Sequence, residues 1–358
     1  MTVNTRDGRP WVVLVGGFLA AGKTTLILAA ARELEKHGLK CAVILNDQGD
    51  DLVDTRYAAL QGLHAAEVRG GCFCCRLTDL VDSIDAMLKH SPAVIFAEPV
   101  GSCTDLSATV FHPLLEYSSK FRIAPFSVLV DPGRWLELAK GPDENMEFLF
   151  RTQIEEADLV VFTKADLYPT TPALQAGTTR QVSAVTGQGV AGWIDEILSG
   201  ELEGGEHLLE IDYERYAMAE AALAWLNLRV LFRPGNPMGP ALVIGPFADA
   251  IEASIEKAEL EIVHMKALVE CSEGLIKVAV SGRGGRKSVE GALTASPADE
   301  HEIRLNIRAT GSPAKLREIV EEHLYALDGE LSGLRLQCFQ PAAPRPERRV
   351  PGVKSDRK

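Results

Sequence analysis

The stretch GFLAAGKT, residues 17–24, decides the fold of this 358-residue chain. It fits the pattern G-x-x-x-x-G-K-[ST], which binds nucleotide phosphates when it joins a buried strand to a helix. An apolar run precedes it at 11–15, and a helical pattern follows at 24–37. The glycines let backbone N–H groups turn toward phosphate, and the amino end of the helix adds a favourable dipole. A plain Gly-rich turn is the alternative, but the Lys-Thr pair and the flanking elements favour a phosphate-binding loop.

Each side chain of this loop has a predicted role. Lys23 brings positive charge to the β and γ phosphates and is a predicted catalytic residue. The Thr24 hydroxyl is expected to ligate Mg²⁺, and Thr25 to contact the α phosphate. The other predicted nucleotide-binding residues of the loop act through their backbone and are Gly17, Ala20, Ala21 and Gly22.

Apolar runs and helical patterns alternate outward from the loop. The expected strands are 11–15, 41–45, 93–97, 126–130 and 159–162, with a shorter one at 181–185. Most are continuous runs of Val, Ile and Leu, which is typical of strands buried on both faces of a parallel sheet. This alternation predicts an α/β fold, a P-loop NTPase with a doubly wound, mainly parallel sheet over residues 1–198.

The pattern changes after residue 198. Residues 199–212 begin with a Gly-rich, acidic stretch and are expected to form a linker. Residues 213–340 combine strand-like runs with two helical patterns, roughly β-α-β-β-α-β with an extra strand, which predicts a smaller α+β, ferredoxin-like domain. Residues 341–358 are rich in Pro and Arg, so a disordered basic tail is expected there.

Two segments in the second half of the predicted sheet can recognise a purine base. Thr163, Lys164 and Asp166 follow the strand at 159–162. A carboxylate at Asp166 can accept hydrogen bonds from guanine N1 and N2, donors that adenine lacks, so this segment favours GTP. Further along the chain, Ser183 and Ala184 can place a backbone N–H near guanine O6.

Carboxylates end two of the predicted strands. Asp47 follows the strand at 41–45 and is expected to orient the attacking water. Glu98 ends the strand at 93–97 and is expected to hold Mg²⁺ through water, while the Gly101 amide contacts the γ phosphate. Ligands of open α/β sheets bind at the carboxyl ends of the strands, so these residues should share one crevice with Lys23. Helix capping or loop solvation is the alternative for Asp47.

Three thiols lie within four positions, at Cys72, Cys74 and Cys75, after two glycines. Such a cluster can bind a soft cation such as Zn²⁺, Co²⁺ or Ni²⁺, with one position left for another ligand. Structural zinc, apolar packing and a redox pair are the alternatives, and each fits the spacing less well. Cys103 can reach the same site or pack in the core, and a lone histidine such as His64 or His112 can complete the coordination.

Composition excludes several classes of protein. The net charge of −13 argues against a general nucleic-acid binder. No apolar run reaches the ~20 residues of a spanning helix, and the first ten residues do not form a signal peptide. Seven cysteines, three of them clustered, suit a reducing compartment, so a cytoplasmic location is expected.

Taken together, these motifs resemble the CobW family of P-loop GTPases, relatives of the hydrogenase- and urease-maturation GTPases. The similar segments are GGFLAAGKTT, ILNDQGDDLVD, RGGCFCCRL, FAEPVG and RTQIEEADLVVFTKADL, which fall between about residues 11 and 195. The resemblance implies a GTP-hydrolysing metallochaperone that uses Mg²⁺ and holds Zn²⁺ or Co²⁺ on the three clustered thiols. It also implies a client protein that receives the metal.

The sequence departs from the family pattern in places and leaves rivals open. Thr163 stands where N-K-x-D has Asn, Glu98 begins an unusual E-P-V-G segment, and no His-rich stretch is present. The main rival is a GTPase that assists a corrinoid or methyltransferase partner and has a structural cysteine cluster. A small-molecule kinase and a non-catalytic zinc adaptor are the others. A homodimer across the nucleotide face is a further expectation.

Overall fold

The computed structural model describes residues 7–138, 143–172, 178–282 and 286–351, and these divide into two compact units. The first unit contains residues 1–48, 58–219 and 343–358, and the second contains residues 49–57 and 220–342. The sequence predicts boundaries at 198, 212 and 340. The units differ from that prediction because residues 49–57 belong with the second unit, whereas 199–219 and the last segment belong with the first.

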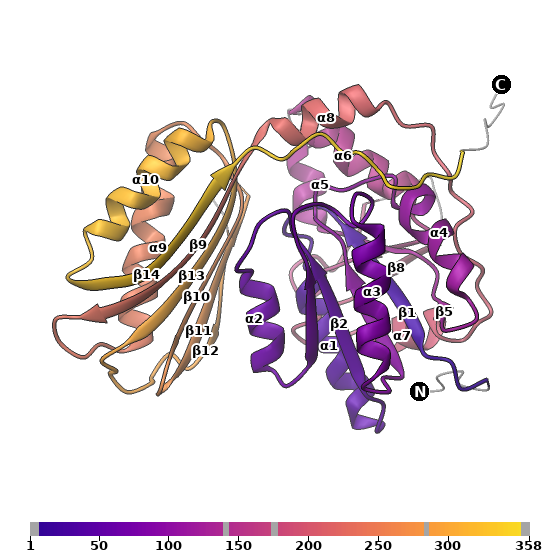
Figure 1. Cartoon of the computed structure of the whole chain (residues 1–358), viewed down its shortest axis with the longest axis horizontal. Coiled ribbons are helices and arrows are strands. Elements are labelled where there is room, and N and C mark those ends of the chain that lie inside the picture. Colours follow the sequence, from indigo (N-terminus) through magenta and orange to yellow (C-terminus); the bar gives the residue numbers. More distant parts are fainter. Residues whose placement is uncertain (1–6, 139–142, 173–177, 283–285, 352–358) are drawn as a thin grey trace. The chain divides into compact units, whose positions relative to one another are not determined.

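The first unit is built on one parallel sheet (Figure 1). The strand order is β3-β2-β4-β1-β6-β7-β8, and β5 pairs with β1. The strands are β1 Trp11–Gly17, β2 Cys41–Asn46, β3 His64–Val68, β4 Val94–Glu98, β5 Arg122–Ile123, β6 Ser127–Val130, β7 Leu159–Phe162 and β8 Thr178–Gln181. The α/β prediction is therefore confirmed, and β1, β2, β4, β6 and β7 are buried throughout, as their apolar runs indicate.

Helices lie between most of these strands, as parallel pairing requires, and two more follow the last strand, β8. They are α1 Lys23–Lys36, α2 Val53–Leu60, α3 Leu77–Leu88, α4 His112–Leu114, α5 Pro132–Leu138, α6 Glu144–Glu155, α7 Val190–Ile197 and α8 Tyr213–Ala221, with a π-helical turn at Ser107–Phe111 and a 3₁₀ turn at Leu115–Tyr117. Gly38 has a φ of 73°, the left-handed conformation expected after α1.

The sequence does not reveal every strand. β3 and β8 are edge strands with the sequences HAAEV and TTRQ, and neither contains an apolar run. Edge strands need only one neighbour and tolerate polar residues, so their pattern is weak. The strand predicted at 181–185 was therefore placed too late, because β8 ends at Gln181.

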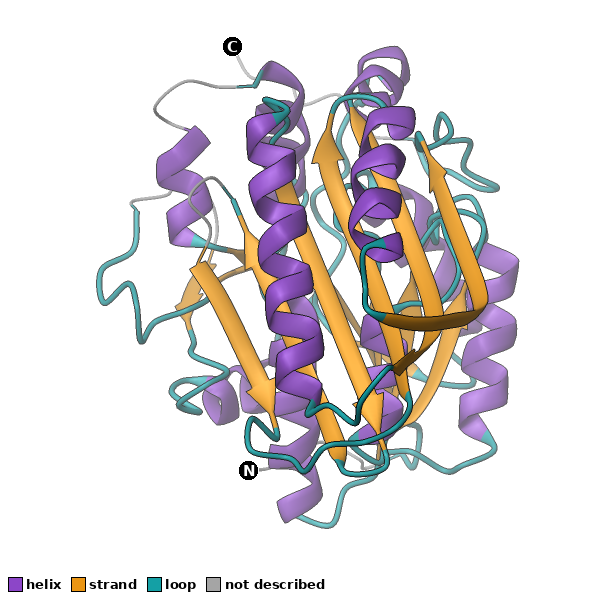
Figure 2. Cartoon of the chain, turned by 90° about the vertical axis from the view of Figure 1, so that its left-hand side faces the viewer, coloured by secondary structure: helices purple, strands orange, loops and turns teal. Residues whose placement is uncertain are grey.

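The second unit has an antiparallel sheet with two helices. Its strands are β9 Leu223–Pro234, β10 Ile262–Cys271, β11 Gly274–Ser281, β12 Arg286–Gly291, β13 His301–Thr310 and β14 Gly329–Phe339, in the order β12-β11-β10-β13-β9-β14. The helices α9 Pro240–Lys257 and α10 Pro313–Tyr325 lie over one face of the sheet (Figure 2). Apolar side chains from both helices and from the strands form a single core between the two layers.

Connectivity explains this sheet. Without the β11–β12 hairpin, the unit is a β-α-β-β-α-β chain with the strand order β14-β9-β13-β10. This is the arrangement of a ferredoxin-like layer, and the hairpin extends its β10 edge. β12 is the strand that the sequence pattern misses, since its sequence RKSVEG lacks an apolar run.

Residues 49–57 belong to the second unit through side-chain contacts with its sheet. The Asn306 carboxamide oxygen accepts from Val53 N at 2.8 Å, and Arg56 forms a two-point ion pair with Glu270. Asp54 pairs with Lys266. The segment that begins two residues after Asp47 is therefore part of the antiparallel unit.

The last segment corrects the prediction of a disordered tail. Residues 343–351 run extended along the first unit (Figure 1, yellow) and form backbone hydrogen bonds from Glu347 N to Cys74 O and from Val350 N to Ala108 O. Pro and Arg suit an extended, unpaired chain, but composition does not show that such a chain finds acceptors on a folded surface. Residues 352–358 of this prediction lie outside the described residues.

Among the described residues, no helix is long and apolar enough to cross a membrane.

Replacing Gly189, which precedes α7, and Gly192, which lies inside it, by alanine should change the free energy of unfolding in opposite directions. Gly189 caps the helix at a φ of 73°, and a Cβ there would lie 2.4 Å from Gln181 O, so Gly189→Ala should cost at least about 2 kcal/mol of unfolding free energy. Gly192 lies inside the helix, where a Cβ would meet nothing within 4 Å, so Gly192→Ala should add about 0.5–1 kcal/mol. Chemical denaturation of both variants tests the pair, and equal signs would contradict this account.

Candidate nucleotide and thiol site

The phosphate loop connects β1 to α1 and is closed by its own lysine. Residues Gly17, Ala20, Ala21 and Gly22 form the loop, and Lys23, Thr24 and Thr25 begin α1. Lys23 Nζ donates to Gly17 O at 2.8 Å and to Phe18 O at 3.3 Å. A Cβ on Gly17 would lie 2.4 Å from Leu129 O, so only glycine lets the loop leave the sheet here.

The predicted magnesium residues meet directly. Thr24 Oγ1 donates to Glu98 Oε2 at 2.8 Å, and both side chains are buried. A hydroxyl and a carboxylate oxygen at this spacing form a donor set that suits Mg²⁺. A Cβ on Gly101 would lie 3.0 Å from Lys23 Nζ and from Leu19 N, so the segment after β4 lies against the phosphate loop.

The residues predicted to recognise the base follow the neighbouring strands β7 and β8. Thr163 Oγ1 donates to Ala21 O at 2.8 Å and so links this segment to the phosphate loop. Asp166 accepts from Ser183 Oγ at 2.6 Å, and Ala184 is the next residue. Lys164 Nζ pairs with Asp131 Oδ2 at 2.6 Å. Asp131 was not among the residues predicted from the sequence. It lies directly after β6, at the carboxyl end of a strand, and this is the kind of position for which Asp47 and Glu98 were selected.

Residues 70–75 carry the three clustered thiols, and we call them the thiol loop. Asn46, the last residue of β2, holds this loop in place through hydrogen bonds. Its Nδ2 donates to Val68 O at 3.0 Å and to Gly71 O at 2.8 Å, and its Oδ1 accepts from Phe73 N at 2.7 Å. Asp47 is the next residue, and its backbone N–H also bonds to Val68 O. The thiol loop is therefore joined to the strand end that carries the predicted water-orienting carboxylate.

The three thiols form a compact cluster in the turn before α3. The sulfur–sulfur distances are 2.6 Å for Cys72–Cys74, 3.3 Å for Cys72–Cys75 and 3.7 Å for Cys74–Cys75. Zinc bonded tetrahedrally to sulfur at ~2.3 Å separates its sulfurs by about 3.8 Å. The Cys74–Cys75 pair has this spacing, and Cys72 must move outward for all three thiols to hold one ion.

Interactions with Cys103 and then with Cys72 raise the pKa of Cys74 well above its usual range. The bonds from Cys103, Cys74 and Cys75 hold the pKa of Cys72 well below its usual range. The hydrogen bond with Cys72 raises the pKa of Cys75 to about 11. Cys72 is therefore the first of the group to become a thiolate, and thiolates are the form that binds metals.

The C-terminal segment 343–351 covers the thiol loop, and we call it the strap. Arg345 N lies 3.1 Å from Cys75 Sγ. The Glu347 carboxylate accepts from Thr78 N at 2.9 Å and from Thr78 Oγ1 at 2.8 Å, so it caps the amino end of α3 with a negative charge. The strap thus contacts both the loop and the helix that follows it.

A buried acid network anchors the far end of the strap. The Arg349 guanidinium donates to Asp105 Oδ2 at 2.7 Å, and Tyr213 donates to the same carboxylate. Thr104, the preceding residue, donates through its hydroxyl to Glu156, which is fully buried and also accepts from Ser107 N. Burial raises the pKa of Glu156 to about 8. Periodicity gave no sign of these residues, because they act through distant partners.

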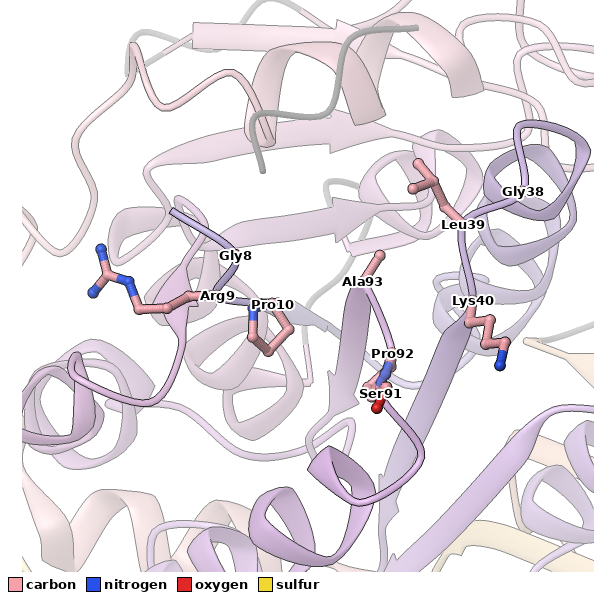
Figure 3. Close-up of a pocket in the computed structure, with 9 residues that line it drawn as sticks. All are labelled: Gly8, Arg9, Pro10, Gly38, Leu39, Lys40, Ser91, Pro92 and Ala93. Atoms are coloured by element: carbon pink, nitrogen blue, oxygen red, sulfur yellow. The ribbon is translucent and has the colours of Figure 1, made fainter. Parts of the chain in front are cut away.

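Other candidates lie elsewhere. The His64 ring stacks on His90, and His112 Nε2 bonds to Gly205 O, so neither ring joins the thiols. Cys41 is buried in β2, while Cys271 and Cys338 are partly exposed in the second unit. A pocket of about 340 Å³ lies before β1, β2 and β4, at the amino ends of these strands (Figure 3). That end of the sheet is opposite the phosphate loop.

The comparison with known families fits this geometry. Residues 11–189 match the family described as CobW/HypB/UreG, nucleotide-binding domain. The chain belongs to the CobW/HypB/UreG family. Every predicted nucleotide and thiol residue lies inside the matched range, so the resemblance inferred from the motifs is confirmed.

The alignments with individual curated relatives cover a smaller part of the chain than the family match does. The chain is 30% identical to the zinc chaperone YeiR of Escherichia coli over 43% of this chain and 46% of the relative. It is also 30% identical to the zinc chaperone YjiA of the same organism, over 44% and 49%. The chain thus spans about half the length of the curated relatives it matches. The solved Zn(II)-bound YjiA GTPase from E. coli is 15% identical over 89% of this chain and 99% of that one, with a TM-score of 0.33, too low to support an argument.

Glu156→Gln should change how stability depends on pH. The folded state raises the Glu156 pKa from its ordinary 4.5 to about 8, so the unfolded chain loses this proton first as pH rises. The stabilising contribution of the neutral acid is complete below about pH 4.5 and is lost as pH rises through about 8. The variant should therefore gain stability relative to the parent over this window, measured by denaturation at several pH values. A constant difference would contradict the assignment.

Proposed function

We propose that this chain binds and hydrolyses GTP and uses the nucleotide cycle to hold zinc on its thiol loop and release it to a client protein. The observation that carries the proposal is the direct attachment of the thiol loop to Asn46, the residue before Asp47. Thiols that bind metal and residues that contact nucleotide then share one rigid connection. A cytoplasmic location and a homodimer remain predictions.

Hydrolysis requires positioning and charge neutralisation more than a strong base. Lys23 and the loop amides would bind the phosphates, and Thr24 with Glu98 would hold Mg²⁺, which neutralises charge on the β and γ oxygens when bound. Asp47 is buried at the end of β2, where it can orient water. The close approach of Gly101 to Lys23 supports its amide as the γ-phosphate contact.

Guanine selection would rest on Asp166. Its bond to Ser183 leaves the second carboxylate oxygen for a donor on the base, and guanine offers two donors at N1 and N2. The Thr163 bond to Ala21 O would keep this segment in register with the phosphates. A site built on a carboxylate acceptor rejects adenine, which has no donor at N1.

Zinc is the favoured metal, since the relatives YeiR and YjiA are named zinc chaperones. Three clustered sulfurs suit zinc, and they also suit Co²⁺, which remains the second candidate. The client stays open as a protein that accepts a thiolate-bound cation. Residues 49–57 link the end of β2 to the antiparallel unit and are the segment through which nucleotide state would affect client recognition.

Metal affinity should depend on the nucleotide. Titrating the protein with Zn²⁺ against a competing chelator, once with Mg²⁺ and a non-hydrolysable GTP analogue and once with Mg-GDP, should give dissociation constants that differ at least about tenfold, or roughly 1.4 kcal/mol of coupling. A Lys23→Ala variant serves as control and should lose the difference. Equal constants for the parent protein would overturn the metallochaperone proposal and favour the rival in which the cysteines are structural.

Asp166→Asn should switch the preferred base. The amide can donate where the carboxylate only accepts, so it pairs with the C2 carbonyl of xanthine and no longer with both guanine donors. We expect GTP affinity to fall about 100-fold and xanthosine triphosphate to become the better ligand, measured by fluorescent-nucleotide displacement. An unchanged preference for GTP would show that another residue recognises the base.

A further inference from the structure

The strap brings a main-chain donor to the exposed edge of the thiol cluster. Cys72 and Cys74 are 3% and 1% exposed, whereas Cys75 is partly exposed, so the cluster opens toward solvent at Cys75. The Arg345 N–H donates to this sulfur, with 3.1 Å between the nitrogen and Cys75 Sγ. The strap therefore contacts the one thiol of the cluster that solvent can reach.

The sequence around this donor restricts its backbone. Arg345 lies between Pro344 and Pro346, and a residue that precedes proline is confined to extended conformations. Two residues further on, Glu347 N donates to Cys74 O at 2.9 Å, so the strap also bonds to the backbone of the thiol loop. The Arg345 N–H thus meets the sulfur from a chain that has little freedom to turn away.

A buried ion pair anchors the strap beyond this contact. The Arg349 guanidinium donates to Asp105 Oδ2 at 2.7 Å and to Leu209 O at 2.6 Å, and Asp105 is 2% exposed. Val350 N donates to Ala108 O at 3.0 Å. Removing one partner of a buried ion pair is costly, because it leaves the other charge without compensation. These bonds keep the strap on the surface of the first unit and so support its contact with the thiols.

Coordination chemistry gives the Arg345 donor a function. A thiolate bound to a metal keeps negative charge on its sulfur, and an N–H that donates to this charge stabilises the bound form. Outer partners of this kind also orient the ligand and control the access of solvent to the metal. A thiolate sulfur has several lone pairs, so Cys75 can bind an ion while it accepts this hydrogen bond.

We propose that the strap completes the metal site of the thiol loop, a role that rests on the proposed function. The Arg345 N–H is the outer hydrogen-bond partner of metal-bound Cys75, and the Arg349–Asp105 ion pair is the latch that keeps this donor in place. With the strap bound, zinc is held tightly and exchanges slowly. Once the latch opens, the sulfur loses its donor and the metal becomes available to a client.

Arg345→Pro tests the donor. The substitution removes the N–H, and proline suits a chain that already lies between two prolines. The zinc dissociation constant, measured against a competing chelator in the nucleotide state that binds zinc more tightly, should rise at least about tenfold, as for other outer partners of metal sites. In cobalt-loaded protein, the sulfur-to-cobalt charge-transfer band should move to longer wavelength, because the hydrogen bond no longer stabilises the sulfur charge.

Two variants control for the other effects of this substitution. Arg345→Ala removes the same side chain and keeps the N–H, so the difference between the two Arg345 variants measures the N–H alone. Ala343→Pro adds a proline to the strap at a residue whose N–H forms no hydrogen bond within the described part of the chain, and it should change neither the dissociation constant nor the band. Equal zinc dissociation constants for the two Arg345 variants overturn the role of the donor.

Arg349→Ala tests the latch. The rate at which zinc passes from the protein to an excess of chelator should rise about tenfold, since the strap loses a charge-assisted bond. Arg348→Ala removes the neighbouring guanidinium, whose ion pair with Glu116 is exposed, and should leave the rate unchanged. If Arg349→Ala fails to fold, Val350→Pro serves in its place, because it removes the N–H that bonds to Ala108 O.

The outcomes separate the strap from the metal site beneath it. A transfer rate equal to that of the parent protein in a folded latch variant overturns the latch, while zinc binding by the parent leaves the proposed function standing. A parent protein that takes up no zinc in either nucleotide state overturns the proposed function as well.

Discussion

The Asn46 carboxamide ties the end of β2 to the end of β3 by donating a hydrogen bond to Val68 O, and to the thiol loop by donating one to Gly71 O and accepting one from Phe73 N. Each is worth only about 0.5–1.5 kcal/mol in net stability, but a buried amide left without partners costs more. All three partners of the carboxamide are backbone groups, two carbonyl oxygens and one N–H. The bonds therefore fix the path of the main chain and not only the position of one side chain. Asp47 is the next residue, so these bonds join the thiol loop to the residue that is predicted to orient water.

The same end of the sheet collects charges of both signs. Lys23 is buried 2.8 Å from a carbonyl oxygen, and Glu98 is buried against the Thr24 hydroxyl. Lys164 and Asp131 form a pair at the next strands. These groups come from the carboxyl ends of separate parallel strands, where ligands of open sheets bind. A nucleotide bound here with its Mg²⁺ would therefore contact several strand ends at once. That shared contact would couple the positions of those strand ends.

The sequence predicted those elements that are determined by residues close together in the chain. The runs at β1, β2, β4, β6 and β7 identified the buried sheet, and the glycine-lysine loop identified the connection from β1 to α1. The edge strand β3 was missed and β8 was placed too late, because exposed strands need no apolar face. The contacts of Arg349 with Asp105 and of Glu347 with Thr78 join segments far apart in the chain, and no single-sequence pattern encodes such pairing. The strap was mistaken for a disordered tail for the same reason, since its stability lies in the surface beneath it.

The position of the strap has a consequence for synthesis. Glu347, whose amide bonds to Cys74 O, leaves the ribosome more than two hundred residues after the thiol loop. At 5–20 residues per second, this interval lasts on the order of tens of seconds. During that time the nascent chain carries its thiols without their cover, so ions and oxidants have access to them that the finished protein restricts. The position of the strap at the end of the described sequence thereby sets how long the thiols of a new chain stay uncovered.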